Sequence, residues 1–255
     1  MAVVVDVTNF ITSSEASLQA KKTATLLKTL NVNAIIIGPS GIGKKSLASY
    51  ILPNAPVYDA SNFDLLLTAL DSSNEIIISN IHLSPNQERL VEAIKKSGVR
   101  VIATALNHNL SSEIEELCSI KIELPPLSER PEDVDALIKL FLEEAEELFG
   151  GNKESYSWKN MTPDLSQNGD SLRRQVMITY LFQDIKDRDL MELLENYLYE
   201  KLGSNNDYKK FLYLYEVPLI RSGLKKYKSQ LKLSEKLGLN RNTLRKKISE
   251  NRQYL

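Results

Sequence analysis

The chain has 255 residues, of which 42% are apolar, and a formal net charge of −1. Its single cysteine, Cys118, excludes a disulfide framework and a thiolate metal site, and His82 and His108 have no ligand partners at metal-binding spacing, so we expect two surface histidines and no metal site. No apolar stretch is long enough to span a membrane and the N-terminus lacks the features of a signal peptide, which predicts a cytoplasmic protein.

The first predicted elements are a strand, a glycine-rich loop and a helix. Residues 33–37 form a short β-branched apolar run that is typical of a strand buried on both faces, and a helix is predicted over residues 46–51. This order is the context of a phosphate-binding loop, where glycines let backbone N–H groups approach a phosphate and a lysine adds charge. The candidate nucleotide-binding residues are Gly38, Gly41, Gly43, Lys44 and Lys45. A glycine turn without a ligand is the alternative.

Further strands follow at regular intervals along the chain. We predict them at residues 57–59, 75–81, 99–104 and 120–124, and helical stretches such as residues 62–70 and 85–96 lie between them. Alternating strands and helices predict an α/β fold, in which a parallel sheet is flanked by helices on both faces.

The C-terminal segment differs from the rest of the chain in charge. Residues 217–255 hold eleven Lys/Arg and two Glu, a local charge of +9, which leaves −10 for residues 1–216. A short amphipathic helix at 231–237, a turn at Gly238 and a second helix at 240–248 predict an all-α helix-turn-helix. Asn240 can cap the second helix, and its exposed face presents Arg241, Thr243, Arg245, Lys246 and Lys247. The alternative is a solvated basic face on an ordinary terminal helix.

These motifs resemble one known family. Residues 230–248 resemble the Fis-type helix-turn-helix of NtrC-type (sigma-54-dependent) enhancer-binding activators. Residues 99–104 resemble the sensor I strand of their AAA+ core, residues 122–134 match the junction between that core and its helical lid, and Arg173 resembles a sensor II residue. The resemblance implies an AAA+ core at residues 1–127, a lid at 128–203 and a Fis-type domain at 204–255.

The resemblance also implies partners. It implies that double-stranded DNA is contacted by Asn240, Arg241, Thr243, Arg245 and Lys246, and we add Lys247 of the same basic face as a sixth predicted DNA-contacting residue. It also implies that the chain forms a homodimer through the helices of residues 207–227. Packing within one chain accounts for the apolar stripes of these helices equally well.

Several positions depart from the family pattern. Ser79 and Asn80 stand where a catalytic carboxylate pair belongs, and no arginine lies between Arg100 and Arg130, where arginine fingers belong. The 34 residues between Lys44 and Ser79 lack the sigma-54-contacting GAFTGA loop. We therefore expect a pseudo-ATPase that is not an enzyme, has no catalytic residues and requires no cofactor. It would bind ATP or ADP without hydrolysis and would not engage the sigma-54 polymerase productively.

Three hypotheses follow for the whole chain. The first is a sequence-specific DNA-binding transcriptional regulator built on this core. The second is a scaffold or adaptor that uses the fold for protein–protein interaction. The third, compatible with the first, is a switch that responds to nucleotide binding.

Overall fold

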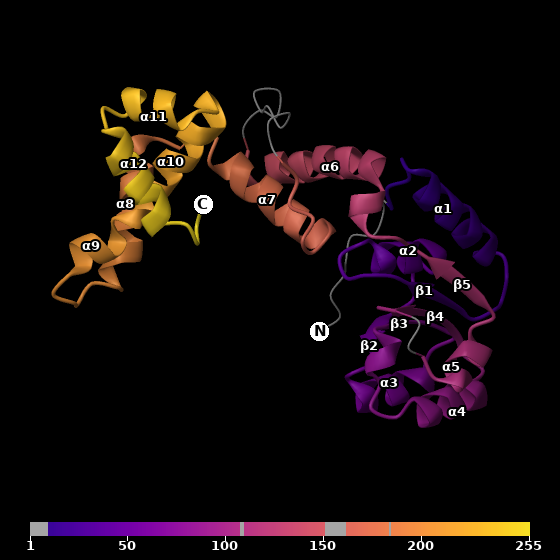
Figure 1. Cartoon of the computed structure of the whole chain (residues 1–255). Helices are drawn as coiled ribbons and strands as arrows, with labels where there is room; N and C mark the ends of the chain where they lie inside the picture. The colour runs from indigo at the N-terminus through magenta and orange to yellow at the C-terminus, as the bar shows by residue number, and fades with distance from the viewer. Residues whose placement is uncertain (1–9, 108–109, 151–161, 184) are drawn as a thin grey trace. The chain divides into compact units, whose positions relative to one another are not determined.

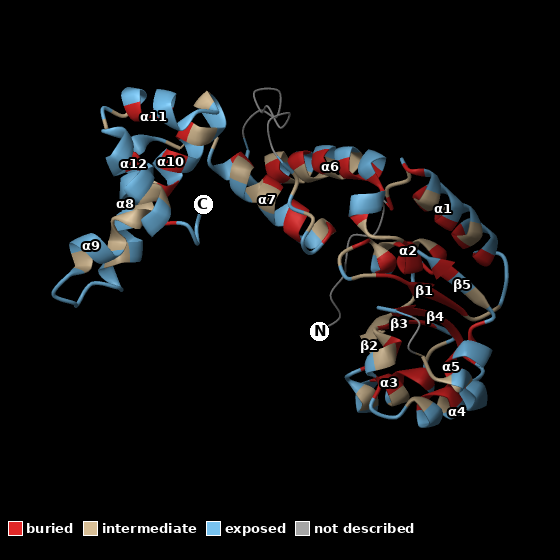
Figure 2. Cartoon of the chain, viewed as in Figure 1, coloured by how far each residue is buried: buried red, intermediate tan, exposed pale blue. Residues whose placement is uncertain are grey.

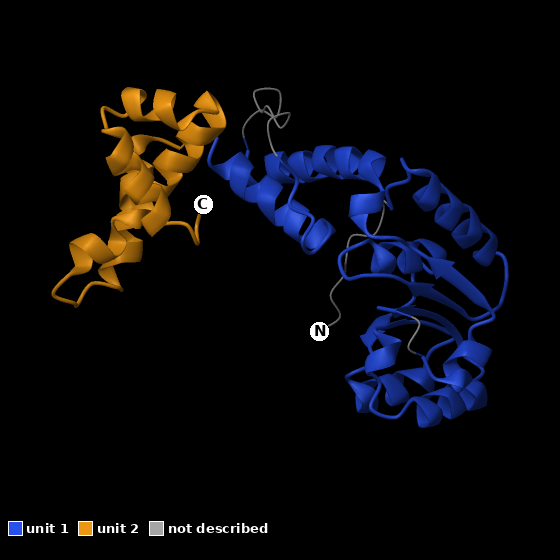
Figure 3. Cartoon of the chain, viewed as in Figure 1, with its two compact units in different colours: residues 1–184 blue, residues 185–255 orange. Residues whose placement is uncertain are grey.

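A computed structural model describes residues 10–107, 110–150, 162–183 and 185–255. The chain forms two compact units, residues 1–184 and 185–255 (Figure 3). The predicted boundaries at 127/128 and 203/204 lie within these units and stay predictions. No helix in the described part of the chain has both the length and the hydropathy that crossing a bilayer requires.

The first unit is built on a five-stranded parallel sheet (Figure 1). The strands are β1 (Ala34–Ile37), β2 (Val57–Asp59), β3 (Glu75–Ser79), β4 (Arg100–Ala105) and β5 (Ile120–Glu123), in the spatial order β2-β3-β4-β1-β5. All residues of β1 and β4 are buried, as expected for central strands rich in β-branched side chains. Because the strands are parallel, the ends of β1, β3 and β4 meet at one edge of the sheet.

Helices cover both faces of the sheet and create two separate apolar clusters (Figure 2). Helices α1 (Glu15–Leu27) and α2 (Lys44–Ile51) pack on the face that carries Ile36, Ile77 and Ile102. Helices α3 (Phe63–Leu70), α4 (Gln87–Ser97) and α5 (Ser112–Leu117) pack on the opposite face, against Ile35 and Ile78. The alternation of neighbouring strand residues between the two clusters follows from the two-residue repeat of a strand.

A 3₁₀ turn and two helices, which we call the lid, complete the first unit. The lid consists of the 3₁₀ turn η2 (Leu127–Glu129) and the helices α6 (Pro131–Phe149) and α7 (Gly169–Leu181). Pro131 occupies the first turn of α6, where its missing N–H costs no hydrogen bond. A third apolar cluster, which includes Leu127, Ile138 and Leu172, holds the two helices together.

The second unit is helical throughout its described elements. It contains α8 (Asp187–Tyr199), α9 (Asp207–Phe211), α10 (Tyr213–Tyr227), α11 (Gln230–Lys236) and α12 (Arg241–Glu250). Ile220, Leu233 and Leu244, one from each of the last three helices, form its small core. Gly223 lets α10 approach α11, because a Cβ atom there would lie 2.2 Å from the Leu233 side chain.

Two predicted element boundaries are corrected by backbone conformation. Strand β3 ends at Ser79, two residues before the predicted end, because Asn80 adopts a left-handed conformation (φ 55°) and a 3₁₀ turn, η1 (Ile81–Leu83), follows. Helix α2 begins at Lys44, two residues before the predicted start, because Gly43 at its N-cap is left-handed (φ 95°).

Candidate functional site

The predicted phosphate-binding loop connects β1 to α2. Gly41 and Gly43 have φ values of 74° and 95°, which side chains other than glycine rarely adopt. Gly38 is needed for a close approach, because a Cβ atom there would lie 2.2 Å from the carbonyl oxygen of Leu124. These glycines turn the loop directly into the first turn of α2, whose N-terminus favours negative charge.

Lys44 is held inside the loop. Its side chain is 8% exposed, and Nζ donates hydrogen bonds to the carbonyl oxygens of Gly38 and Pro39. Burial lowers the pKa of Lys44 to about 8; the Asp170 carboxylate opposes this shift and the Lys45 ammonium adds to it. The neighbouring Lys45 is exposed.

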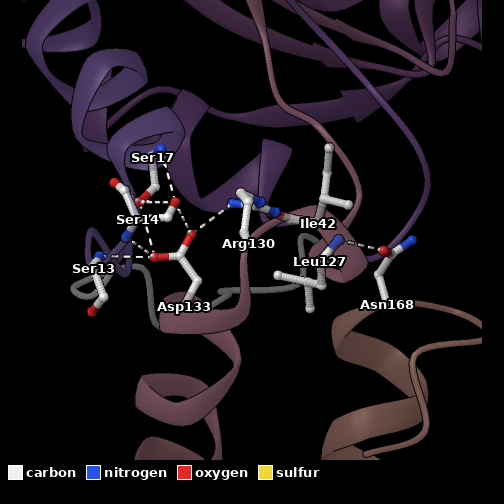
Figure 4. Close-up of polar contacts among 8 residues, drawn as sticks. All are labelled: Ser13, Ser14, Ser17, Ile42, Leu127, Arg130, Asp133 and Asn168. Atoms are coloured by element: carbon white, nitrogen blue, oxygen red, sulfur yellow. Dashed lines mark hydrogen bonds and ion pairs between the residues drawn. The ribbon is translucent and has the colours of Figure 1, made fainter.

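The start of α7 lies directly on the loop. Asn168 donates from Nδ2 to the carbonyl oxygen of Ser40 (2.8 Å) and accepts at Oδ1 from the Leu127 N–H (2.9 Å) (Figure 4). The Gly169 N–H donates to the carbonyl oxygen of Gly41 (2.9 Å). The lid is thus hydrogen-bonded to the loop by both side-chain and backbone groups.

A buried ion pair joins three distant segments beneath the loop (Figure 4). Arg130 and Asp133, exposed by 2% and 1%, lie 3.1 Å apart, and Arg130 Nη2 also donates to the carbonyl oxygen of Ile42 (3.2 Å). Asp133 accepts from the Ser13 and Ser14 N–H groups (2.8 Å each) and from the hydroxyls of Ser14 and Ser17 (2.9 Å each). This network was not predicted from the sequence. The Ser14 and Ser17 spacing is a capping signal, but it does not identify Asp133 as the acceptor.

A cavity of about 940 Å³ adjoins the loop. Its lining combines apolar side chains from the N-terminal segment and the lid with charged and polar groups of the loop and the strand ends. They include Phe10, Lys44, Lys45, Asn80, Thr104 and Asp170. Arg173 also lines it, and its guanidinium is paired with Glu144. The lining places apolar side chains beside charged groups of both signs, a combination that suits a charged small molecule.

The end of β3 carries the two positions where the sequence suggested a lost carboxylate pair. Ser79 and Asn80 do lie there, but a carboxylate reaches the same place from β2. Asp59 Oδ2 accepts from Asn80 Nδ2 (2.7 Å) and from the Ser79 hydroxyl (3.1 Å). Burial raises the pKa of Asp59, but hydrogen bonds from Ser61, Asn80 and Ser79 outweigh it and hold this pKa below its usual value.

The expectation of two surface histidines is wrong for His82. Both ring nitrogens of His82 are buried without a hydrogen-bond partner in the described residues. Burial lowers the pKa of His82, as does the nearby Lys44 ammonium, while Asp59 opposes the shift. His82 lies in η1 and is half-buried, and its two ring nitrogens are covered near the charges of Lys44 and Asp59. His108 lies outside the described residues.

The second unit contains the helices of the predicted helix-turn-helix. Ser229 caps α11 by accepting from the Lys232 N–H, and Asn240 caps α12 by accepting from the Asn242 N–H (2.9 Å). Gly238 supplies a left-handed residue between them (φ 63°). Leu244 is buried and Ile248 packs against the same cluster, as the sequence predicted.

Five of the six predicted DNA-contacting residues share one exposed region at and after the start of α12. They are Asn240, Arg241, Thr243, Arg245 and Lys246. Lys246 is 77% exposed, and its ammonium is 3.9 Å from the Glu250 carboxylate. Lys247 differs, because it is less exposed and forms an ion pair with Glu216 of α10. Its charge is therefore used within the unit.

Comparisons with known proteins agree with this arrangement. No protein-family model matches the chain. It is 27% identical over 206 residues to the DNA-binding transcriptional regulator NtrC of Azospirillum brasilense, with 61% of this chain and 42% of the relative covered. The NtrC of Rhizobium meliloti (strain 1021) is 26% identical over 204 residues, with the same coverage. The chain thus spans less than half the length of these relatives.

Among solved structures, NtrX from Brucella abortus in complex with ATP superposes with a TM-score of 0.55 at 16% identity, covering 97% of this chain and 70% of NtrX. NtrX in complex with ADP gives a TM-score of 0.57 at 16% identity, covering 95% and 68%. The predicted fold class is confirmed: the chain has a five-stranded parallel sheet flanked by helices, as in AAA+ P-loop proteins.

The expectation that the protein is not an enzyme is contradicted. The chain has the AAA+ fold, which is a fold of ATPases, and NtrX, which shares it, was crystallised with ATP and with ADP. The replaced residues of β3 also do not leave this place without a carboxylate, because Asp59 of β2 is hydrogen-bonded to both Ser79 and Asn80.

Proposed function

We propose that this protein is a DNA-binding transcriptional regulator with a nucleotide-binding AAA+ core. The observation that carries the proposal is the capped, basic α12 in the helical second unit of a chain that is similar in sequence to NtrC. Arginine and asparagine side chains at the start of such a helix can bond base edges, and lysines contact phosphates.

Binding to genomic DNA fragments tests the DNA part of the proposal. The full-length protein is expected to enrich discrete sites. Arg241→Ala should weaken binding to a selected site by about 1–3 kcal/mol and relax its sequence preference. Lys246→Ala should weaken binding to all sequences and lower the salt slope by about one unit. Lys96→Ala, which alters an exposed lysine of α4, is the matched control and should leave the DNA affinity unchanged.

The outcome also separates the proposed function from the scaffold hypothesis. If neither the wild type nor the Lys96→Ala protein retains DNA above background, the DNA proposal is wrong and a protein partner becomes the leading explanation. If Arg241→Ala lowers the affinity for every DNA sequence by the same amount, the protein binds DNA non-specifically.

The loop is the proposed site for ATP or ADP. Phosphate is favoured there by three features: the left-handed backbone at Gly41 and Gly43, the N-terminus of α2, and the Lys44 ammonium. Nucleotide should raise the melting temperature of the wild type, and Lys44→Ala should abolish this rise. The absence of any shift in the wild type would remove nucleotide from the proposal.

We further propose a homodimer through the second unit. No residue of α8 is buried, and its apolar residues Leu190, Met191 and Leu194 are 57%, 63% and 39% exposed. Exposed apolar surface on this scale favours a protein contact. Sedimentation of the full-length protein tests the dimer, and Leu190→Glu should give a monomer.

Because no GAFTGA loop lies between Lys44 and Ser79, the proposed regulator acts without productive contact with the sigma-54 polymerase.

A further inference from the structure

The ends of β2 and β3 bring a carboxylate and an amide together beside the cavity. In the parallel register Asp59 lies opposite Ser79, the last residue of β3, and Asn80 follows directly. Each oxygen of the Asp59 carboxylate has two donors: Ser61 N–H and hydroxyl on Oδ1, and the Asn80 amide and Ser79 hydroxyl on Oδ2. Asp59 is therefore fixed in one orientation, with its charge at the strand ends.

The contact with Asp59 also fixes the direction of the Asn80 amide. An ionised carboxylate can only accept, so the side of the amide that faces Asp59 at 2.7 Å must be the NH₂ group. The carbonyl oxygen Oδ1 then points away from Asp59, and it has no hydrogen-bond partner in the described residues. The backbone of Asn80 is equally constrained, because it is left-handed and its N–H donates to the Thr104 hydroxyl (3.1 Å).

Asn80 lines the cavity together with Lys44 and Thr104. The Asn80 amide thus lies at the cavity, and the Asp59 carboxylate is hydrogen-bonded to its nitrogen. This is the arrangement by which a carboxylate behind a ligand orients that ligand and strengthens its donor atom.

We propose that Asn80 Oδ1, positioned and polarised by Asp59, holds the magnesium ion of a magnesium–nucleotide complex in this cavity. The inference rests on the proposed nucleotide binding and adds a metal-contacting residue and a positioning residue to it. Magnesium prefers oxygen ligands, keeps several of its waters and takes further ligands from nucleotide phosphates. A single protein oxygen therefore fits its needs.

The charges around the loop agree with this choice. Lys45 occupies the position where a P-loop commonly supplies a hydroxyl to magnesium, so the loop itself adds no anionic or hydroxyl ligand there. Within the described residues no group of three or more His, Cys, Asp or Glu side chains could hold a metal ion unaided. The ion is therefore expected to bind together with ATP and not to the free protein.

The test compares ATP affinity in magnesium chloride and in EDTA by titration calorimetry on the full-length protein. For the wild type we expect magnesium to strengthen ATP binding by about tenfold or more. Asp59→Asn should keep the affinity measured in EDTA, which depends on the loop, and lose most of the magnesium effect. Asp64→Asn, which alters an exposed carboxylate on α3, is the matched control and should behave as the wild type.

A second variant separates loss of the ligand from loss of the fold. Asn80→Gly removes the amide but suits the left-handed backbone, so it should fold and should lose the magnesium effect as Asp59→Asn does. Circular dichroism verifies that each variant is folded.

The outcomes distinguish the two levels of the argument. Absence of ATP binding in both buffers would overturn the proposed nucleotide site and this inference with it. ATP binding by the wild type that is equal in magnesium and EDTA would overturn the magnesium site alone. The magnesium site would also be overturned if magnesium strengthened ATP binding to folded Asp59→Asn or Asn80→Gly as much as to the wild type.

Discussion

Removal of the Asp133 carboxylate is expected to lower the free energy of unfolding far more than removal of its cationic partner, the Arg130 guanidinium. Asp133→Ala leaves the buried Arg130 guanidinium with the Ile42 carbonyl as its one acceptor among the hydrogen bonds of Figure 4. It also removes the acceptor of the Ser13 and Ser14 N–H groups. Arg130→Met, in contrast, leaves the carboxylate with four donors from the N-terminal segment.

The magnitudes follow from this asymmetry. Breaking a buried ion pair so that a charge is left without its partner costs about 3–5 kcal/mol, and we expect Asp133→Ala to reach this range. In Arg130→Met the Asp133 carboxylate keeps its other hydrogen bonds. We therefore expect the free energy of unfolding to fall by about 1–3 kcal/mol, close to the cost of one unsatisfied buried group. Glu132→Ala changes an exposed neighbour on α6 and should cost little.

Urea unfolding of the full-length protein measures these free energies, and amide hydrogen exchange locates the change. In Asp133→Ala the amides of Ser13 and Ser14 should exchange faster, whereas in Arg130→Met they should stay protected. Equal costs for the two variants, or unchanged exchange at both serines in Asp133→Ala, would refute the view that this carboxylate organises the segment.

Four other predictions concern the loop, the helix-turn-helix and the cysteine. Because burial lowers the pKa of Lys44 to about 8, its phosphate-binding charge is present below that pH and lost above it. ATP affinity, measured by calorimetry, should therefore fall up to about tenfold per pH unit above 8, and Lys44→Arg should remove this fall. Gly223→Ala should destabilise the second unit by about 1–3 kcal/mol in thermal unfolding, because the added Cβ meets Leu233 at 2.2 Å. Asn240→Ala should cost about 0.5–2 kcal/mol, seen as faster amide exchange in α12. Burial raises the pKa of the Cys118 thiol to about 12, so a disulfide reagent at neutral pH should label it only after unfolding in urea.

The parts that could be predicted from the sequence are those encoded by neighbouring residues. The loop of Gly38–Lys44 needs only a strand before it and a helix after it, and the Asn240 cap of α12 is set by a spacing of two residues. The alternation of strands and helices was sufficient to predict the parallel sheet.

The parts that could not be predicted depend on contacts between distant residues. Asp133 contacts Ser14 across 119 positions, and no local pattern links them. Asp59 was recognised as the end of a strand, but its role beside Asn80 requires knowing that β2 lies next to β3. His82 was misplaced because polarity alone suggested exposure, whereas the left-handed Asn80 redirects the chain and buries the ring nitrogens.

The two faces of the sheet in the first unit differ in their relation to the cavity. The cluster beneath α3, α4 and α5 contains none of the residues that line the cavity, while Phe10 and Ile42 of the opposite cluster do line it. Substitutions at sites without shared neighbours add independently in their effect on stability. Apart from Ala60 and Ile81, which adjoin Asp59 and Asn80, the α3–α5 face can therefore accumulate conservative changes during evolution at a cost in stability alone, while the ligand-facing side keeps its shape.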